Sequence, residues 1–375
     1  MTRQYRPDVE MTFLDGPPGS GKSTKLLKDC AGWPEPWAIC TFSKDAAAHL
    51  TNRGVPKEQA GTIYSMSWPH VKLVSSGRAK QSKQPAWQRR KLQDGGDQAL
   101  LQYEMSAPSK QKPIELLPQL YAWGAIGSLN FVAGLNFEKG AEFALGLARW
   151  LEAGAPWEEG FEGYEFIAID EAQDMGALEL CAALALLKPG GKLLAVGDPG
   201  QSIFASSKGV KDGDLPPAYT WADHHEVLAQ GFRVGAPCSN AAANVLAPYY
   251  ERPASTFTAK HTTQVLLWGG APPTDGLVLG LSRYGVSTWV RNHDVRDYAV
   301  SPQVKNRSLT VCTIHAAKGA EADDVYLLPW SRGKLDLVYN EDPGLLRLLY
   351  VAATRARKRL HAPAELFNLL TRNLI

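Results

Sequence analysis

The feature that most constrains this chain is a glycine-rich octapeptide, Gly16-Pro17-Pro18-Gly19-Ser20-Gly21-Lys22-Ser23. It follows a short apolar run (EMTFL, residues 10–14) and leads into a segment of helical character, KSTKLLKDC. Strand, glycine-rich loop and helix in this order make a phosphate-binding P-loop. The glycines let backbone N–H groups face the phosphates, Lys22 reaches the β- and γ-phosphates, and the Ser23 hydroxyl binds Mg²⁺. The octapeptide therefore predicts a nucleotide-binding α/β domain that uses Mg²⁺, and the alternative is an ordinary glycine-rich turn.

A P-loop site also needs a second strand that ends in acidic residues, because these residues hold the metal. Residues 165–174 (EFIAIDEAQD) contain four apolar residues followed by Asp170 and Glu171. We expect Asp170 to hold Mg²⁺ and Glu171 to orient and deprotonate the attacking water. An acidic run after a strand is by itself more often a solvated loop. Its combination with the P-loop favours the catalytic interpretation.

Length and composition limit the class of protein. The chain has 375 residues, which at about 100 to 200 residues per domain predicts two to three domains. Hydrophobic residues make up 45% and charged residues 21%, as in globular proteins, which argues against disorder and against a fibrous class. The net charge of +2 is too small to indicate a nucleic-acid partner by itself. Any basic surface must therefore be local.

The order of apolar and helical segments predicts the domain organisation. Apolar runs bounded by turn residues recur along the chain and are separated by helical stretches, which is typical of parallel sheets in an α/β protein. Residues 76–160 instead show helical spacing and no clear strand, and we expect them to form a helical insertion in the first α/β domain. The expected limits are residues 1–75 and 161–225 for the first domain, 76–160 for the insertion and 226–375 for the second domain.

The sequence also predicts the compartment. No stretch approaches the 18 apolar residues of a membrane span, and the first ten residues lack the apolar run of a signal peptide. The five cysteines are far apart, odd in number and without a CxxC pair, which argues against a zinc site and against a disulfide framework. We expect buried thiols in a cytoplasmic protein, of a bacterial cell or a phage-infected host, with no membrane partner.

Six further segments accompany the P-loop and the DEAQD run. They are TFSKDAA from Thr41, GTIYS from Gly61, VGDPGQSIF from Val196, QGFR from Gln230, TIHAAKGAE from Thr313 and LLYVAATRA from Leu348. In this order they resemble the motifs of superfamily I DNA helicases of the UvrD/Rep type, over most of the chain. The resemblance implies two RecA-like P-loop NTPase domains with parallel sheets. It also implies an ATP-dependent single-stranded-DNA translocase and helicase that moves 3′ to 5′ and hydrolyses ATP in the interdomain cleft.

The resemblance assigns further nucleotide contacts. Gln201 would couple the γ-phosphate to DNA, Phe232 would stack on adenine, and Glu321 would contact the ribose. Thr24 stands where the family commonly has an adenine-stacking arginine, and Lys25 is its weak substitute. The upstream adenine-reading glutamine segment of the family is not recognisable here. The preference for ATP over other nucleotides therefore stays open.

Two arginines explain why such a motor needs a second domain. Arg233 and Arg355 are fixed cations that can neutralise charge developing on the γ-phosphoryl group, and arginine fingers are worth about 10³ to 10⁵ in rate. On a second domain they complete the site only when the cleft closes, which links hydrolysis to domain movement. A lone arginine is more often a surface ion-pair partner. The matched segments favour the catalytic role for both.

The expected DNA contacts offer hydrogen bonds and stacking rings that tolerate any base sequence. By resemblance they are Thr41, Phe42, Thr62, Tyr64, Phe204, Thr313 and His315. The alternative for Phe42 and Tyr64 is that they are core aromatics. A basic stretch from Arg78 to Lys91 could grip the phosphate backbone, and a solvated helix face is the equal alternative. The expected partners are single-stranded DNA, single-strand/double-strand junctions, and a loading, replication or repair protein.

Two rival functions belong to other classes. One is a DNA-gated ATPase switch that recruits partners without unwinding. The other is a small-molecule kinase, which is disfavoured because it has no need of arginine segments on a second domain. Only 80 residues separate Arg233 from Thr313, too few for the regulatory insertion of the family's long members. The chain would therefore be a compact motor.

Overall fold

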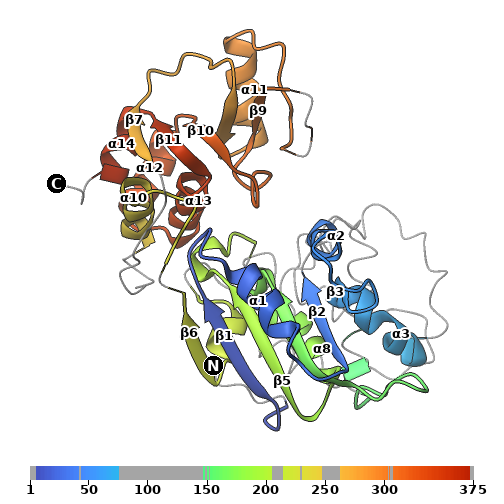
Figure 1. Ribbon diagram of the computed structural model, residues 1–375. Helices are drawn as coiled ribbons and strands as arrows, with labels where there is room; N and C mark the ends of the chain where they lie inside the picture. Colours follow the sequence, from blue (N-terminus) through green and yellow to red (C-terminus); the bar gives the residue numbers. More distant parts are fainter. Residues whose placement is uncertain are drawn as a thin grey trace. The chain divides into compact units, whose positions relative to one another are not determined.

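The computed structural model describes residues 6–41, 44–75, 147, 150–151, 153–204, 214–228, 230–246, 262–302, 304 and 307–371. The chain divides into two compact units, one comprising Met1–Asp15 with Lys22–Glu226 and the other Gly16–Gly21 with Val227–Ile375. Each unit has its own β-sheet (Figure 1). Residues 76–146 of the expected insertion, the whole basic stretch from Arg78 to Lys91, and Phe42 lie outside the described residues.

The first unit is built on a six-stranded sheet with the strand order β3-β2-β4-β5-β1-β6. The strands are β1 (Glu10–Asp15), β2 (Trp37–Thr41), β3 (Ala60–Thr62), β4 (Tyr164–Asp170), β5 (Leu187–Gly197) and β6 (His224–Val227). The pairs β1–β5, β4–β5, β2–β4 and β2–β3 are all parallel. Their carboxyl ends therefore share one edge, where open α/β sheets bind ligands. The P-loop, Thr41, Thr62, Asp170 and Gly197 all lie at that edge.

Helices connect these strands and supply the core. They are α1 (Lys22–Cys30), α2 (Lys44–Asn52), α3 (Ile63–Ser75), α8 (Ala177–Ala185) and α9 (Pro217–Thr220). Every residue of α8 is buried, because the helix is apolar on all sides except at Glu179. It packs against α3 and β5. A buried acid in an otherwise apolar helix requires hydrogen-bond partners.

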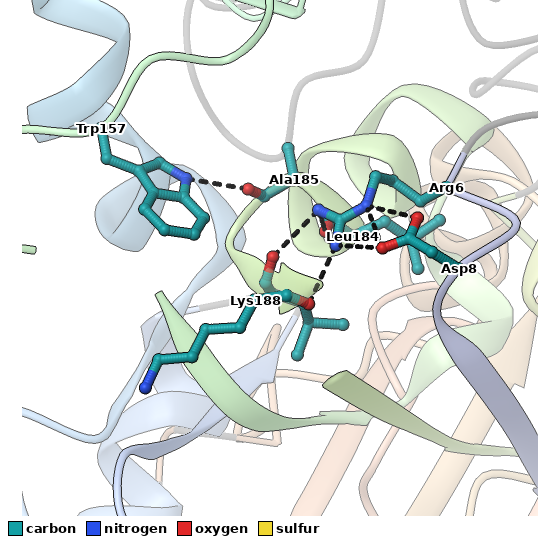
Figure 2. A network of polar contacts seen from close by, with 7 residues as sticks. Arg6, Asp8, Trp157, Leu184, Ala185 and Lys188 are labelled. Atoms are coloured by element: carbon teal, nitrogen blue, oxygen red, sulfur yellow. Dashed lines mark hydrogen bonds and ion pairs between the residues drawn. The ribbon is translucent and has the colours of Figure 1, made fainter. Parts of the chain in front are cut away.

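The amino edge of the first sheet is held by an arginine (Figure 2). The Arg6 guanidinium donates hydrogen bonds to the carbonyls of Leu184, Leu187 and Lys188, each at 2.9 Å, and pairs with Asp8. The hydrogen bond from Arg6 holds the pKa of Asp8 below its ordinary value. The last carbonyls of a helix have no partner within the helix, and a cation there is favourable. Arg6 therefore ties the segment before β1 to the end of α8.

The second unit is built on a five-stranded sheet with the strand order β7-β11-β10-β8-β9. The strands are β7 (Gln264–Leu267), β8 (Gly276–Gly280), β9 (Leu309–Thr313), β10 (Ala322–Leu327) and β11 (Ala356–Ala362). All four neighbouring pairs are parallel. The helices are α10 (Ala236–Leu246), α11 (Arg283–Asn292), α12 (Arg332–Tyr339), α13 (Pro343–Ala353) and α14 (Ala364–Thr371).

Local sequence explains where helix α13 of this unit begins. Asp342 precedes α13 and its carboxylate accepts a hydrogen bond from the Leu345 N–H at 2.8 Å, while Pro343 occupies the first helical position. Both residues are typical of helix starts.

Two units with parallel sheets confirm the predicted α/β, RecA-like fold class. Among the described helices, none has both the length and the apolar composition of a membrane span.

Candidate nucleotide and nucleic-acid sites

The P-loop has the backbone that its glycines allow. Gly19 and Gly21 adopt φ angles of +73° and +84°, which side chains beyond glycine rarely tolerate. The Ser20 N–H closes a turn onto the Pro17 carbonyl at 3.1 Å. The Ser20 hydroxyl is buried and has no hydrogen-bond partner among the described residues. A buried polar group without a partner in a phosphate-binding loop fits a site that receives a ligand oxygen.

The two predicted Mg²⁺ ligands lie together. The Ser23 hydroxyl donates to the Asp170 carboxylate at 3.0 Å from Oδ2 and 3.3 Å from Oδ1. Burial, and then the charge of Glu171, raise the pKa of Asp170 to about 6, against the opposing effects of Ser23 and Lys22. A divalent cation would relieve the cost of this buried carboxylate. A hydroxyl and a carboxylate are oxygen ligands suited to Mg²⁺, which commonly takes its remaining ligands from phosphate and water.

Glu171 is held in an unusual conformation. Its φ and ψ of 57° and 39° lie in the left-handed region, at a cost of about 1 to 3 kcal/mol for a residue other than glycine. Its N–H donates to Asp170 Oδ1 at 3.1 Å, and its side chain accepts a hydrogen bond from Gln173 Nε2 at 2.5 Å. The strand end therefore turns sharply between the metal ligand and the predicted base, and both carboxylates are anchored.

Gln173 is a residue that the sequence analysis missed. Its side-chain nitrogen donates to Glu171. Its side-chain oxygen accepts from the Asp198 N–H at 3.1 Å, and its backbone carbonyl accepts from the Ser202 hydroxyl at 2.8 Å. A Cβ added to Gly197 would lie 2.4 Å from that side-chain oxygen, so this contact requires glycine at residue 197. The available signal was a glutamine two residues after the predicted base, together with the glycine of VGD.

Gln201 belongs to the same network. Its side-chain amide donates to Asp198 Oδ2 at 3.0 Å, while the Gly200 N–H donates to the other carboxylate oxygen at 3.0 Å. Asp198 also donates its own N–H to Gln173, as described above. The structure thus joins the predicted base to the predicted γ-phosphate-coupling glutamine through the Gln173 side chain and through the backbone N–H and carboxylate of Asp198. Phe204, a predicted DNA contact, is half-buried just beyond this segment.

Thr24 has a neighbour that the sequence did not indicate. Its exposed hydroxyl accepts a hydrogen bond from Arg53 Nη2 at 3.2 Å. Lys25, the weak substitute for an adenine-stacking arginine, is instead paired with Asp29 at 2.6 Å. The first turn of α1 therefore has one planar cation beside it, contributed by the residue after α2.

The predicted DNA contacts of the first unit differ in their surroundings. Thr41 is fully buried at the end of β2. Thr62 ends β3 and directly precedes α3, and its hydroxyl accepts from the Ser65 N–H at 3.1 Å. Tyr64 packs against the hydrophobic core, and its hydroxyl donates to Glu179 Oε1 at 2.6 Å. The Tyr64 side chain is therefore directed into the core.

The predicted residues of the second unit fall at opposite edges of its sheet. Thr313 ends β9 and accepts a hydrogen bond from the Ala316 N–H at 3.3 Å, and His315 follows, half-buried. Burial, and then the charge of Lys318, lower the pKa of His315. By contrast, Glu321 directly precedes β10 and Arg355 directly precedes β11. Parallel strands place these two at the amino edge and Thr313 at the carboxyl edge.

The amino-edge residues are held by local contacts. Arg233 Nε pairs with Glu321 Oε2 at 2.8 Å, with both side chains about one-third exposed. Phe232 is 54% exposed, as a stacking residue would be. Arg355 is only 2% exposed, and its guanidinium donates to the carbonyls of Val351 at 2.9 Å and Ala320 at 3.2 Å. It therefore serves the packing of its own unit in this structure.

Taken together, the sheet order and the P-loop network define a P-loop nucleotide-binding protein with two parallel-sheet units. A family model described as an AAA domain matches residues 6–207, and a model described as the UvrD-like helicase C-terminal domain matches residues 296–363. The chain therefore belongs to the AAA-domain family and, with the second match, to the UvrD-like superfamily I helicases. This confirms the resemblance carried by the motifs.

Solved structures similar to this chain include three structures of viral helicases. Arterivirus nonstructural protein 10 (helicase) in complex with DNA is 17% identical, with a TM-score of 0.45, over 98% of this chain and 63% of that chain. A crystal structure of the same viral protein is 17% identical, with a TM-score of 0.44, over 96% of this chain and 61% of that chain. The PRRSV helicase is 17% identical, with a TM-score of 0.40, over 95% of this chain and 52% of that chain. This chain thus spans about half to two thirds of their length. No curated protein matches the chain.

Proposed function

We propose that this protein is an ATP-dependent single-stranded-DNA translocase and DNA helicase of 3′ to 5′ polarity. The observation that carries the proposal is the hydrogen-bonded network at the carboxyl edge of the first sheet. It joins the predicted metal ligands Ser23 and Asp170 to Glu171, and Glu171 through Gln173 and Asp198 to Gln201. A protein that only binds nucleotide needs the first part, and a motor needs the connection to Gln201.

The chemistry follows from the positions of these groups. Residues 16–23 bind the phosphates, and Thr24 lies where the nucleoside would begin to contact the protein. Lys22 supplies a cation to the β- and γ-phosphates. Ser23 and Asp170 would hold Mg²⁺, which would supply positive charge beside the negative charge that develops on the phosphates. Glu171 accepts the proton of the attacking water, and its hydrogen bond to Gln173 fixes the carboxylate that does so.

The second unit contributes cations and a strand-binding edge to this mechanism. We assign Arg233 and Arg355 to charge stabilisation at the γ-phosphate, Phe232 to the base and Glu321 to the ribose. Thr41, Thr62, Phe204, Thr313 and His315, with Phe42, would bind the DNA strand. Closure of the two units on ATP then moves the strand. The partners are single-stranded DNA and strand junctions, with a loading, replication or repair protein, in the cytoplasm of a bacterial cell or a phage-infected host.

The strongest rival is a DNA-gated ATPase switch that displaces no strand, because it would keep every nucleotide residue. The deciding experiment measures ATP hydrolysis with and without single-stranded DNA, and strand displacement from duplexes with a 3′ or a 5′ tail. The proposal predicts DNA-stimulated hydrolysis and displacement from the 3′-tailed duplex, with Glu171→Gln as the inactive control. Stimulated hydrolysis without displacement of either duplex would favour the switch. Phosphate transfer to a small acceptor would indicate the kinase.

A further inference from the structure

The contact between Tyr64 and Glu179 joins two segments that are 115 residues apart in sequence. Tyr64 lies in the first turn of α3, directly after the end of β3, where Thr62 is proposed to contact a DNA strand. Glu179 lies in the first turn of α8, just after the DEAQD segment. The 2.6 Å hydrogen bond between their side chains therefore connects the strand-binding edge to the catalytic segment within one unit.

Glu179 continues the connection to the backbone. Its second carboxylate oxygen accepts a hydrogen bond from the Gly176 N–H at 3.0 Å. Gly176 comes two residues after the short 3₁₀-helix Ala172–Asp174, which contains Gln173. Since Gln173 holds Glu171 at 2.5 Å, a shift of Tyr64 can reach the predicted base through Glu179, Gly176 and Gln173.

Packing alone does not explain an acid at this place. Glu179 is 3% exposed, while the other residues of α8 are Ala, Leu and Cys. Burial, and then the charge and hydrogen bond of Glu179, raise the pKa of Tyr64 well above its ordinary value, so the phenol stays a donor. A buried ionisable group is costly unless paired, and apolar residues of similar volume are often as stable or more so. The Gly176 contact caps the start of α8 and accounts for an acid at this position, whereas the Tyr64 hydroxyl ties that cap to α3.

We propose that Tyr64 is a positioning residue that transmits the binding of a DNA strand at Thr62 to the catalytic carboxylate Glu171. A strand seated on the amino end of α3 fixes Tyr64. Tyr64 then fixes Glu179, the backbone at Gly176 and the segment that carries Gln173. This inference rests on the proposed DNA-stimulated ATPase and names the side chains through which the stimulation passes.

The alternative is that the Tyr64 ring stacks on a DNA base. The two interpretations differ in which part of the side chain matters. Tyr64→Phe keeps the ring and removes only the hydroxyl, so a stacking role predicts unchanged stimulation. The positioning role predicts that single-stranded-DNA affinity changes by less than about twofold, while the ratio of DNA-stimulated to unstimulated hydrolysis falls roughly tenfold, as expected from one lost hydrogen bond to a charged group.

Three further variants separate positioning from general damage. Ser67→Ala removes another hydroxyl bonded within α3, to the Ile63 carbonyl at 2.8 Å, and should keep the wild-type ratio. Glu179→Gln should also keep it, because an amide can donate to Tyr64 and accept from Gly176. The double variant Tyr64→Phe/Glu179→Gln removes the buried charge together with the link, and its ratio should stay low.

The measurement is ATP turnover with and without saturating oligo(dT), with strand affinity by fluorescence anisotropy and folding by thermal denaturation. A wild-type ratio in Tyr64→Phe, in a protein stimulated by DNA, would overturn the inference and leave the proposed function intact. A ratio restored in the double variant would also overturn it, since the loss would then come from an unpaired charge. A wild-type protein whose hydrolysis ignores DNA would overturn the proposed function as well.

Discussion

The two units use their parallel sheets differently. In the first unit, Asp170, Thr41 and Thr62 lie at the carboxyl edge, where β1 ends and leads into the P-loop, and the amino edge carries the structural residue Arg6. In the second unit, Thr313 lies at the carboxyl edge. The predicted nucleotide residues, Arg355 among them, lie at the amino edge.

Physical chemistry gives a reason for this difference. Phosphates are best bound by the N–H groups at a helix start, and in parallel α/β units helix starts follow the carboxyl ends of strands. The first unit, whose strand β1 precedes the P-loop and whose helix α1 follows it, must therefore use that edge. The second unit is expected to contribute cations instead, and a guanidinium acts from any position that reaches the phosphate. Its amino edge is thus free for nucleotide residues, and the segment from Thr313 to Glu321 connects the two edges.

The largest expected effect tests the carboxyl edge of the first unit. Glu171→Gln should lower kcat by about 10⁴-fold, the upper range for a positioned general base, and should leave ATP bound. Lys22→Ala should also abolish turnover but weaken nucleotide affinity, because it removes a phosphate cation. Single-turnover hydrolysis and equilibrium ATP binding distinguish the two. Near wild-type turnover by Glu171→Gln would mean that another group is the base.

The next effect tests the division of the second sheet. Arg233→Ala, at the amino edge, should lower kcat by about 10³-fold, the lower range for an arginine finger, with single-stranded-DNA affinity retained. Thr313→Val, at the carboxyl edge, should weaken DNA binding several-fold and leave unstimulated hydrolysis within about twofold, because one hydrogen bond is worth roughly 1 kcal/mol. Turnover and fluorescence anisotropy check both variants. Equal effects of the two variants on hydrolysis and on DNA binding would show that the two edges of the second sheet do not serve different functions.

Arg355 tests how far the amino edge serves both chemistry and packing. Alanine there should lower kcat by at least about 10²-fold, since Arg233 remains as a second cation. It should also lower the thermal midpoint, because the carbonyls of Val351 and Ala320 lose their donor. DNA-stimulated turnover and denaturation are measured on the same sample. Unchanged turnover with a lowered midpoint would make Arg355 a structural residue only.

The amino edge of the first unit should respond in the opposite way. Arg6→Ala removes hydrogen bonds to three carbonyls and should lower the free energy of unfolding by about 1 to 3 kcal/mol. Its kcat at a permissive temperature should equal that of the wild type. Denaturant titration and steady-state turnover provide the check. A large loss of turnover in a folded Arg6→Ala protein would show that both amino edges serve the reaction.

The smallest effect concerns pH at the carboxyl edge of the second unit. Burial, and then Lys318, lower the pKa of His315 below its ordinary 6.5, so the folded protein keeps the imidazole neutral where the unfolded chain takes up a proton. Its contribution to stability is present above pH 6.5 and is lost as the pH falls through the folded-state pKa. His315→Gln should flatten the fall in thermal midpoint between pH 7 and pH 5. An equally steep fall in the variant would assign the loss to other groups.

Local patterns predicted much of this protein because the relevant interactions are local. Strand, glycine-rich loop and helix are consecutive, and so are the apolar end of β4 and its two acids. The parallel α/β class followed from repeated apolar runs between helical stretches. The exposed edge strand β6 was not predicted, because its residues (HHEV) have no apolar pattern.

Contacts between distant residues were decided only by the tertiary structure. The motifs identified Asp170, Glu171 and Gln201. They did not show that Gln173 and Asp198 connect Glu171 to Gln201, or that the absence of a side chain at Gly197 leaves room for this contact. They placed Tyr64 near DNA, and the fold turned its hydroxyl to Glu179. They marked Arg355 as a cation, and the fold buried it among carbonyls. The sequence determines which groups are present and the order of strands and loops, whereas hydrogen-bond partners depend on which strand ends meet at an edge.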